Sequence, residues 1–179
     1  MPSWLWIVIG VVAAAVVTGL VVAGITAWNN AVRSYFLRLM GRREEARTVR
    51  RAFEGLVDQV RSSDAEKTAF ADDRDTLERR SMAELRDRAR MLGEELNTIA
   101  LPKRLWPSAE ALADACDVLA EEAGRVGDDV VGDVTLEQLD AVDLARVEAA
   151  FAHADRQFTK MSAALGVEDS GTFAGGLYH

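Results

Sequence analysis

Few side chains in this 179-residue chain could do chemistry, and they are scattered. There is one cysteine, Cys116, and two histidines, of which His179 is the last residue. His153 is followed by Asp155, but side chains two residues apart on a helix point in different directions. Metal sites need clustered ligands, and Cys116 falls on an apolar helical stripe, where we expect an inert core thiol. The sequence therefore predicts no metal centre and no cofactor.

An acidic turn, GDDVVGD at 127–133, is the best candidate for a cation loop. A calcium loop needs oxygen ligands at alternating positions and a glutamate at its twelfth position. The turn lacks both, so we interpret it as a polar turn. The sequence also lacks HExxH, GxSxG and a glycine-rich phosphate loop. Acidic helices always offer paired carboxylates, and without a cleft none can be named as a catalyst, so we expect a protein that is not an enzyme.

The most specific pattern in the sequence is typical of a membrane span. From Trp4 to Trp28 the chain has no charged side chain. A helix of that length reaches roughly 37 Å, enough to cross a hydrocarbon core about 30 Å thick. Trp4 and Trp6 at one end and Trp28 at the other suit the headgroup level of the two leaflets. We expect a single transmembrane helix within residues 1–30.

The residues after this run predict its orientation. Arg33 and Arg38 are the first of seven arginines before position 52, which face only two glutamates. Basic side chains next to a span are retained on the cytoplasmic side. We therefore expect the amino terminus outside the plasma (inner) membrane and the following domain in the cytoplasm. A cleaved signal peptide is the competing interpretation, but the start lacks basic residues and the apolar run exceeds the usual ~7 to 15 residues.

Composition narrows the partners. The net charge is -8, and the part of the chain after the basic block is strongly acidic, which disfavours nucleic acid. A lone cysteine fits a reducing compartment, and the excess of arginine over lysine is typical of bacteria with GC-rich genomes. Ala15, Gly19 and Ala23 form a ridge of small residues that could pack against a second span. A homo-oligomer is thus one expectation, and a plain anchor is the other.

A heptad seam follows the predicted span and indicates one continuous helix to about Arg61. Its members are Val32, Tyr35, Leu39, Arg42, Ala46, Val49, Phe53, Leu56 and Val60. The seam could form a self-associating coiled coil or the first helix of a bundle. Apolar stripes downstream need a partner, which favours the bundle.

Capping patterns predict three further helices. The second begins at Ser63 and is expected to break or kink near Ser81, where a serine and a glutamate again stand three residues apart. The third is expected from Ser108 to Gly127, and the fourth from Thr135 to Gly166 with a bend near Asp143. The predicted fold class is all-α: an amino-terminal transmembrane helix continues into an antiparallel cytoplasmic bundle of about four helices over 31–166, followed by a flexible tail, 167–179.

A proline-bounded loop, LPKRLWP at 101–107, joins the second and third predicted helices. If the first helix extends about 45 Å away from the membrane and the second runs back over the same length, the loop lies at the membrane surface. Lys103, Arg104 and Trp106 suit anionic headgroups and the interface. We expect a membrane contact here, and the alternative is that Trp106 closes one end of the core.

These features favour a non-catalytic interaction, scaffold or accessory-subunit protein on the cytoplasmic face. The expected partners are the lipid bilayer and another membrane or cytoplasmic protein, with no nucleic acid. One alternative is a parallel dimer that senses or relays a membrane state through its spans and juxtamembrane coiled coil. The other is a bundle that opens to hold a hydrophobic ligand.

Overall fold

A computed structural model describes residues 3–127 and 129–167, with side chains from residue 16 onward. Its helices are α1 (Ser3–Arg61), α2 (Asp64–Asp72), α3 (Leu77–Thr98), α4 (Trp106–Ala123), α5 (Asp133–Asp140) and α6 (Leu144–Leu165), and a 3₁₀ turn, η1 (Lys103–Leu105), precedes α4. The described part of the chain contains no strand. The prediction of an all-α helical bundle is confirmed.

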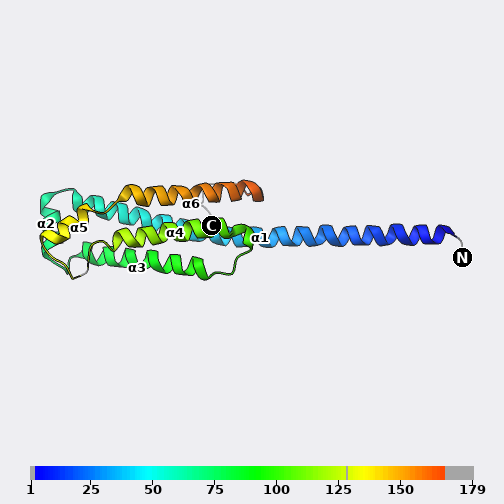
Figure 1. Ribbon diagram of the computed structural model, residues 1–179, viewed down its shortest axis with the longest axis horizontal. Coiled ribbons are helices and arrows are strands. Elements are labelled where there is room, and N and C mark those ends of the chain that lie inside the picture. Colours follow the sequence, from blue (N-terminus) through cyan, green and yellow to red (C-terminus); the bar gives the residue numbers. More distant parts are fainter. Residues whose placement is uncertain (1–2, 128, 168–179) are drawn as a thin grey trace, which may run out of the picture.

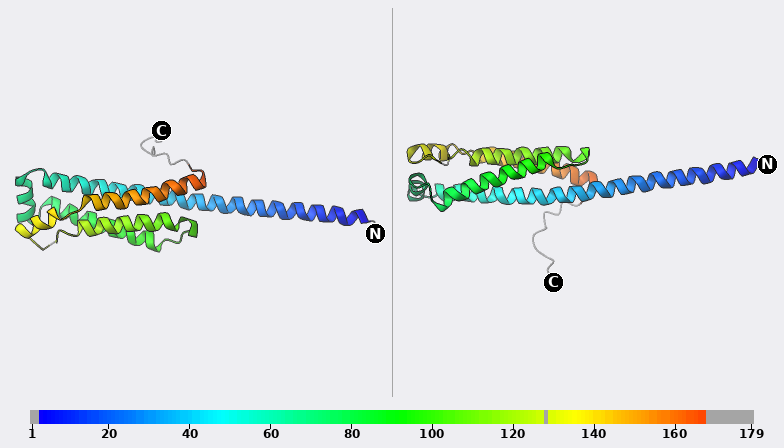
Figure 2. Two further views of the ribbon diagram at one scale, coloured as in Figure 1. Left: turned by 45° about the horizontal axis from the view of Figure 1, so that its top comes forward. Right: turned by 90° about the horizontal axis from the view of Figure 1, so that it is seen from below.

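Four long helices, α1, α3, α4 and α6, form an up-and-down bundle (Figures 1 and 2). α4 packs closely on both α3 and α6. α1 contacts all three of these helices, α3, α4 and α6. The short helices α2 and α5 cover one end, which we call the distal end. The α3–α4 loop and the end of α6 lie at the other end, from which α1 projects, and we call it the proximal end.

α1 is one unbroken helix of 59 residues. From Val16 to Ala31 every residue is exposed, and the first buried residue is Val32. The helix therefore has a free amino-terminal part and a part that is built into the bundle, with no break between them. The predicted continuity to Arg61 is confirmed.

Within the residues that it describes, the structure contains no helix with an apolar stretch long enough to cross a membrane. The predicted span Trp4–Trp28 lies within α1 and begins before residue 16, so the side chains of Trp4, Trp6 and Ala15 are not among the described ones. The predicted tail lies outside the described residues, except for Val167.

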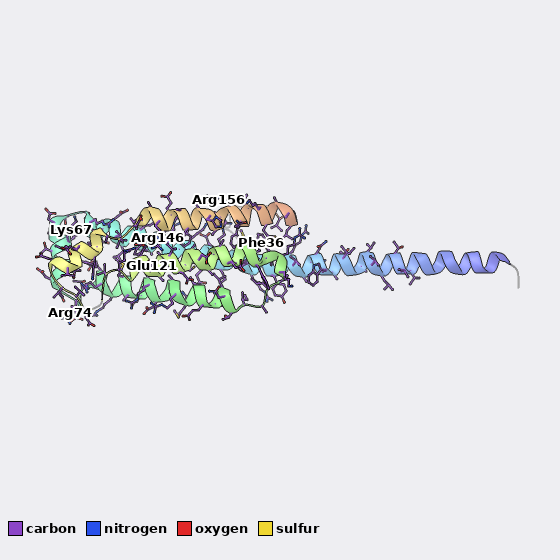
Figure 3. All side chains as sticks on the ribbon, viewed as in Figure 1. Phe36, Lys67, Arg74, Glu121, Arg146 and Arg156 are labelled. Atoms are coloured by element: carbon purple, nitrogen blue, oxygen red, sulfur yellow. The ribbon has the colours of Figure 1, made fainter. Side chains whose placement is uncertain are left out.

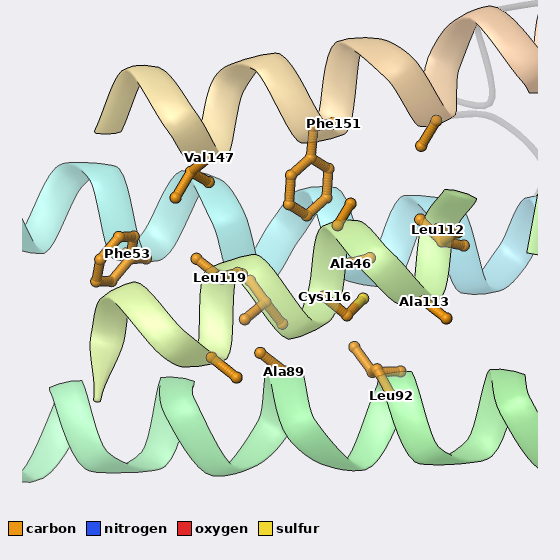
Figure 4. Packing of buried hydrophobic residues seen from close by; sticks show 14 of the residues in the cluster. Ala46, Phe53, Ala89, Leu92, Leu112, Ala113, Cys116, Leu119, Val147 and Phe151 are labelled. Atoms are coloured by element: carbon orange, nitrogen blue, oxygen red, sulfur yellow. The ribbon is translucent and has the colours of Figure 1, made fainter. Parts of the chain in front are cut away.

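The core is a row of phenylalanines and aliphatic side chains between α1 and α6, continued by alanines and leucines between α3 and α4 (Figure 4). Phe36 and Phe158 are both 0% exposed, and their ring centroids are 6.0 Å apart. Full burial of a phenylalanine contributes about 1.5–3 kcal/mol, so this row is a main source of stability.

The buried face of α1 is turned slightly from the predicted seam. Six of the nine predicted positions are buried, namely Val32, Leu39, Ala46, Val49, Phe53 and Val60. Tyr35, Arg42 and Leu56 are only partly buried, and the neighbouring positions Phe36, Arg43 and Val57 are buried instead. Both choices keep a spacing of three and four residues, so periodicity alone could not separate them.

Arg43 explains why the second choice is the real one. Its Nε donates to Asp155 Oδ1 of α6 at 2.8 Å, and its guanidinium lies 4.9 Å from the centroid of the Phe158 ring. An ion pair and a cation–π contact together allow a charged group inside the bundle. Positions 42 and 43 are both arginine, so the rule that a seam position is apolar could not choose between them.

The predicted break at Ser81 is wrong, because the chain breaks at 73–76 and Ser81 lies inside α3. Thr76 caps α3 by accepting a hydrogen bond from the Arg79 backbone N–H at 3.3 Å. Asp73 accepts one from the Asp75 N–H at 2.8 Å, which turns the chain before the cap. Aspartate and threonine side chains form such local bonds readily, and here the cap of α3 lies five residues before the predicted capping box at Ser81.

Three other boundaries differ from the prediction. α4 begins at Trp106, not at Ser108, because Pro107 fits the first turn of a helix, where its missing N–H costs nothing. α4 ends before Gly124, three residues earlier than the predicted Gly127. The predicted bend near Asp143 is a full break between α5 and α6, and Asp143 caps α6 by accepting from the Arg146 N–H at 2.9 Å.

Candidate functional site

Two arginines from different elements bind the end of α6 at the proximal end. Arg33 of α1 donates from Nε and Nη2 to the carbonyl of Leu165 at 3.1 and 2.8 Å. Arg104 of η1 donates from Nη2 to the carbonyl of Ala164 at 3.2 Å. The last carbonyls of a helix have no hydrogen-bond partner within the helix. Positive charge there also interacts favourably with the negative end of the helix dipole. The contacts join α1, the α3–α4 loop and α6 at one level.

Trp106 lies next to these contacts, and its indole ring is partly exposed to solvent. It is 47% exposed, and its indole Nε1 donates to the carbonyl of Leu101 at 3.1 Å. The ammonium of Lys103 lies 6.0 Å from the indole ring. Leu105, which is 0% exposed, closes the core at this end. The alternative in which Trp106 closes the core is therefore wrong.

Apart from Trp28, which lies on the free part of α1, the predicted interface residues with described side chains belong to the proximal part of α1 and to the α3–α4 loop with the first residue of α4. We call Arg33, Arg38, Lys103, Arg104 and Trp106 the proximal surface, and all five are exposed. The guanidinium of Arg38 lies 5.8 Å from the ring of Tyr35 on the same helix. The structure thus brings together residues that the sequence separates by about 70 positions.

The free part of α1 exposes a continuous set of large apolar side chains. They are Val16, Val17, Leu20, Val21, Val22, Ile25 and Trp28, each between 55% and 69% exposed. The hydroxyl of Thr26 donates to the Val22 carbonyl at 2.9 Å, so its hydrogen bond is made within the helix. Apart from the adjacent turns of α1 itself, no described atom lies within 4 Å of a Cβ added at Gly19 or Gly24. This helix face therefore has no partner within the described part of the chain.

No family model, curated protein or solved structure matches this chain. Its function has to be inferred from its own surfaces and buried groups.

An open groove of about 950 Å³ runs between α1 and α3. Ala52, Gly55 and Leu56 line one wall, and Leu85 and Met91 line the other. The groove is open to solvent, unlike the enclosed pockets that bury most of a small ligand. A hydrophobic ligand, the second alternative function, would therefore find a shallow surface here and not an internal cavity. The heptad seam of α1, which the coiled-coil alternative needs for dimerisation, packs against other helices of the same chain, because its central residues are buried there.

The most buried ionised cluster lies between α4 and the start of α6. Glu122 is 0% exposed and accepts hydrogen bonds from Arg125 Nε and Nη2 at 2.5 and 3.0 Å. It also accepts from Arg146 Nη1 at 2.8 Å and from the Asp143 N–H at 3.0 Å. Burial raises the pKa of Glu122, but these hydrogen bonds outweigh it and hold the pKa below its ordinary value. A carboxylate with four donors is a structural clamp and has no free lone pair for proton transfer.

A second buried arginine fixes the acidic turn. Arg79, only 7% exposed, donates from Nη2 to the carbonyls of Gly127 and Val130 at 2.7 and 2.8 Å and reaches Thr135 Oγ1 at 3.4 Å. These carbonyls, which a cation would need, are bound by the guanidinium. Among the described residues no group of three or more histidines, cysteines or acidic residues could hold a metal.

Neither the thiol nor the histidine forms a reactive pair. Cys116 is 0% exposed, and burial, followed by the charge of Asp117, raises its pKa to about 12. His153 is exposed on α6, while Asp155 two residues later binds Arg43 and Arg47 of α1 at 2.8 and 2.9 Å. The two side chains therefore face different surroundings, as the sequence predicted.

Sequence reasoning missed the two buried arginine networks. Neither Arg79 nor Glu122 was identified from the sequence. A signal exists for Glu122, since Arg125 stands three residues later on a helix that is otherwise rich in alanine. Arg79 carries no such signal, because its acceptors are main-chain carbonyls about 50 residues away.

Proposed function

We propose that the protein is a single-pass membrane protein whose helical bundle is a non-catalytic interaction module on the cytoplasmic face of the plasma (inner) membrane. The observation that carries this proposal is the continuity of α1. Its exposed apolar part passes into the buried seam at Val32 without a break. Soluble monomers rarely leave a large continuous apolar surface in water. A lipid bilayer covers such a helix on all sides, and a helix is the form in which a single apolar segment can cross one.

The basic side chains of the proximal surface support the orientation. Arg33 and Arg38 follow the apolar part of α1 directly, and the hydrogen bonds of Arg33 and Arg104 to the end of α6 place Arg104 at the same end of the bundle. Arginine and lysine next to a span remain in the cytoplasm. The bundle then hangs from the membrane with its proximal end against the headgroups.

The distal end is the surface offered to a protein partner. Val32 to Arg61 forms a rod of about 45 Å, so the distal end stands far from the bilayer. Its short helices carry the acidic side chains of Asp64, Glu66, Asp72, Asp133 and Glu137. Complementary charge favours a basic partner and speeds its encounter. A scaffold or an accessory subunit is the role that fits this arrangement.

Two measurements on the full chain in bacterial cells test the proposal. We expect alkaline carbonate to leave the protein in the membrane and detergent to release it. We also expect a carboxy-terminal green fluorescent protein fusion to be fluorescent and an alkaline phosphatase fusion to be inactive, because the bundle is cytoplasmic.

A matched pair of variants makes the extraction specific. Replacing Leu20 and Val21 together by lysine places two charges in the apolar stretch, at about 2.5–3.5 kcal/mol each near the centre of a span, and should release the protein. Replacing the exposed Leu37 and Leu77 by lysine adds the same charge to the bundle and should not. Extraction of the unmodified chain by carbonate, or an active phosphatase fusion, would overturn the proposal.

A further inference from the structure

We infer that the α3–α4 loop is a second membrane contact, and that it recognises anionic phospholipid headgroups. The inference rests on the proposed anchoring through α1 and adds a lipid-binding site to it. The loop is an exposed apolar and basic surface with Ile99 and Trp106 at its two ends and Lys103 and Arg104 between them.

The first argument is the height of the loop above the membrane. Arg33 and Arg104 bind the carbonyls of consecutive residues at the end of α6, so η1 and Arg33 lie at the same level along the bundle axis. Arg33 comes five residues after Trp28, a rise of about 7.5 Å along the helix. Trp28 is the last large apolar residue of the free part of α1. The loop therefore lies at the depth of the headgroups, and Figure 2 shows it beside α1 where that helix leaves the bundle.

The second argument is the way in which Trp106 is presented. Its indole N–H is already bonded to the Leu101 carbonyl, so the exposed part of the ring can enter the interface without losing a hydrogen bond. Leu105, the next residue toward η1, fills the core in its place. An exposed tryptophan with a satisfied N–H next to a membrane is the kind of side chain that anchors proteins at the interface.

The third argument is charge. Lys103 lies against the Trp106 ring, and no carboxylate in the described part of the chain is within ion-pair distance of it. Arg104 donates to a neutral carbonyl, so its charge is also uncompensated. A lysine or arginine near an anionic surface contributes attraction that falls off within a Debye length. The acidic distal end is several Debye lengths away and is not drawn to the same surface.

Together α1 and the loop would fix the bundle in place. A single helix anchor leaves rotation about its axis and tilt free, whereas a second contact on α4 removes both. The groove between α1 and α3 and the acidic distal end would then face constant directions in the cell.

The test uses the full chain with Trp4, Trp6 and Trp28 replaced by phenylalanine, so that Trp106 is the only tryptophan. The protein is reconstituted in vesicles that contain brominated phosphatidylcholine, a quencher of tryptophan, with or without phosphatidylglycerol. We expect strong quenching of Trp106 fluorescence in vesicles with phosphatidylglycerol and weak quenching without it.

The matched variants are Lys103→Gln and Lys67→Gln. Lys67 lies at the distal end, whereas Lys103 is on the proximal surface (Figure 3). Lys103→Gln should lower the equilibrium constant for contact about fivefold, the factor that corresponds to about 1 kcal/mol per basic side chain near an anionic surface. Lys67→Gln should leave the quenching unchanged.

Carbonate extraction of the same vesicles separates the two proposals. If the protein resists extraction but Trp106 is not quenched, the loop does not touch the membrane and the anchoring stands. If quenching is equal with and without phosphatidylglycerol, or equal in the two glutamine variants, recognition of charge is overturned. If carbonate removes the protein, the proposed function fails and this inference fails with it.

Discussion

At the scale of single residues, Glu122 is the least exposed charged group in the described part of the chain. It lies at the junction of α4 and α6 with no exposed surface and with donors from Arg125, Arg146 and the Asp143 backbone. Glu121, its neighbour, binds the same Arg146 at 2.8 Å but on the surface. The two glutamates therefore differ in burial and share a partner, which makes them a natural pair for comparison.

We expect Glu122→Gln to lower the free energy of unfolding by about 3 kcal/mol, because it removes the buried charge that three groups bind and places an amide NH₂ where a carboxylate oxygen accepted hydrogen bonds. Glu121→Gln should change it little, since exposed ion pairs contribute little. Thermal unfolding in mild detergent, followed by circular dichroism at pH 7, measures both. Equal melting temperatures for the two variants would show that Glu122 is not the clamp described above.

The same residue gives a pH dependence. The pKa of Glu122 is lowered in the folded state from its ordinary value of 4.5, so its contribution is present above about that pH and is lost as the pH falls through the folded value. The pKa of Asp155 is lowered in the same direction, because the hydrogen bonds from Arg47 and Arg43 outweigh the effect of burial. The loss of stability between pH 7 and pH 3 should therefore be smaller in Glu122→Gln than in the unmodified chain.

At the scale of elements, the contact between α3 and α4 depends on small side chains. Ala89 of α3 and Cys116 of α4 are both 0% exposed, and Figure 4 shows them on the facing sides of these two helices. A Cβ added at Gly93 would lie 2.7 Å from Asp117 Oδ1 and 3.6 Å from Cys116 Cβ. At Gly41, on the outer face of α1, an added Cβ would meet nothing within 4 Å.

The same substitution at these two glycines should have opposite effects. Gly93→Leu should destabilise the protein by about 2–3 kcal/mol, because a large side chain cannot fit between α3 and α4 without moving them apart. Gly41→Leu should stabilise it by about 0.5–1 kcal/mol, because glycine in an exposed helix is unfavourable. Unfolding midpoints of the two variants check this, and a stable Gly93→Leu variant would contradict the close packing.

The sequence predicted these elements better than it predicted their ends. Four long amphipathic helices were identified because each carries an apolar stripe with a period of three and four residues. The breaks were harder, since the predicted capping box at Ser81 lies inside α3, and the helix is capped instead by Thr76 after the turn that Asp73 makes. Arg43 and Arg79 could not have been placed inside, because their burial depends on partners distant in sequence.

At the scale of the whole molecule, α1 determines where everything else lies. Its free part is expected to be in the membrane, and its second part is one of the four rods of the bundle. The sequence indicated this continuity because no proline or capping signal separates the two parts. The position of the α3–α4 loop along α1 could not be predicted from the sequence. It is fixed by the hydrogen bonds from Arg33 and Arg104 to the end of α6.

A distance measured across Asn29 and Asn30 tests whether α1 is rigid between its free part and its bundle part. Spin labels on Gly24→Cys and Asp58→Cys, in a Cys116→Ala background, are separated by 34 residues of α1, or about 51 Å along a continuous helix. We expect a narrow distribution near that distance in vesicles, by pulsed electron paramagnetic resonance. A break at the two asparagines would shorten and broaden it, since asparagine is among the weaker helix formers.

A second label pair, Leu37→Cys with Asp58→Cys, lies wholly inside the bundle part of α1 and should give about 31 Å with a narrow width. If the inner pair is narrow and the outer pair is broad, the helix is hinged at the membrane surface. The height of the loop above the bilayer would then no longer follow from its position against α1. A narrow outer pair means that the span carries the bundle as one rigid body, so whatever rotates or tilts the span also moves the acidic distal end.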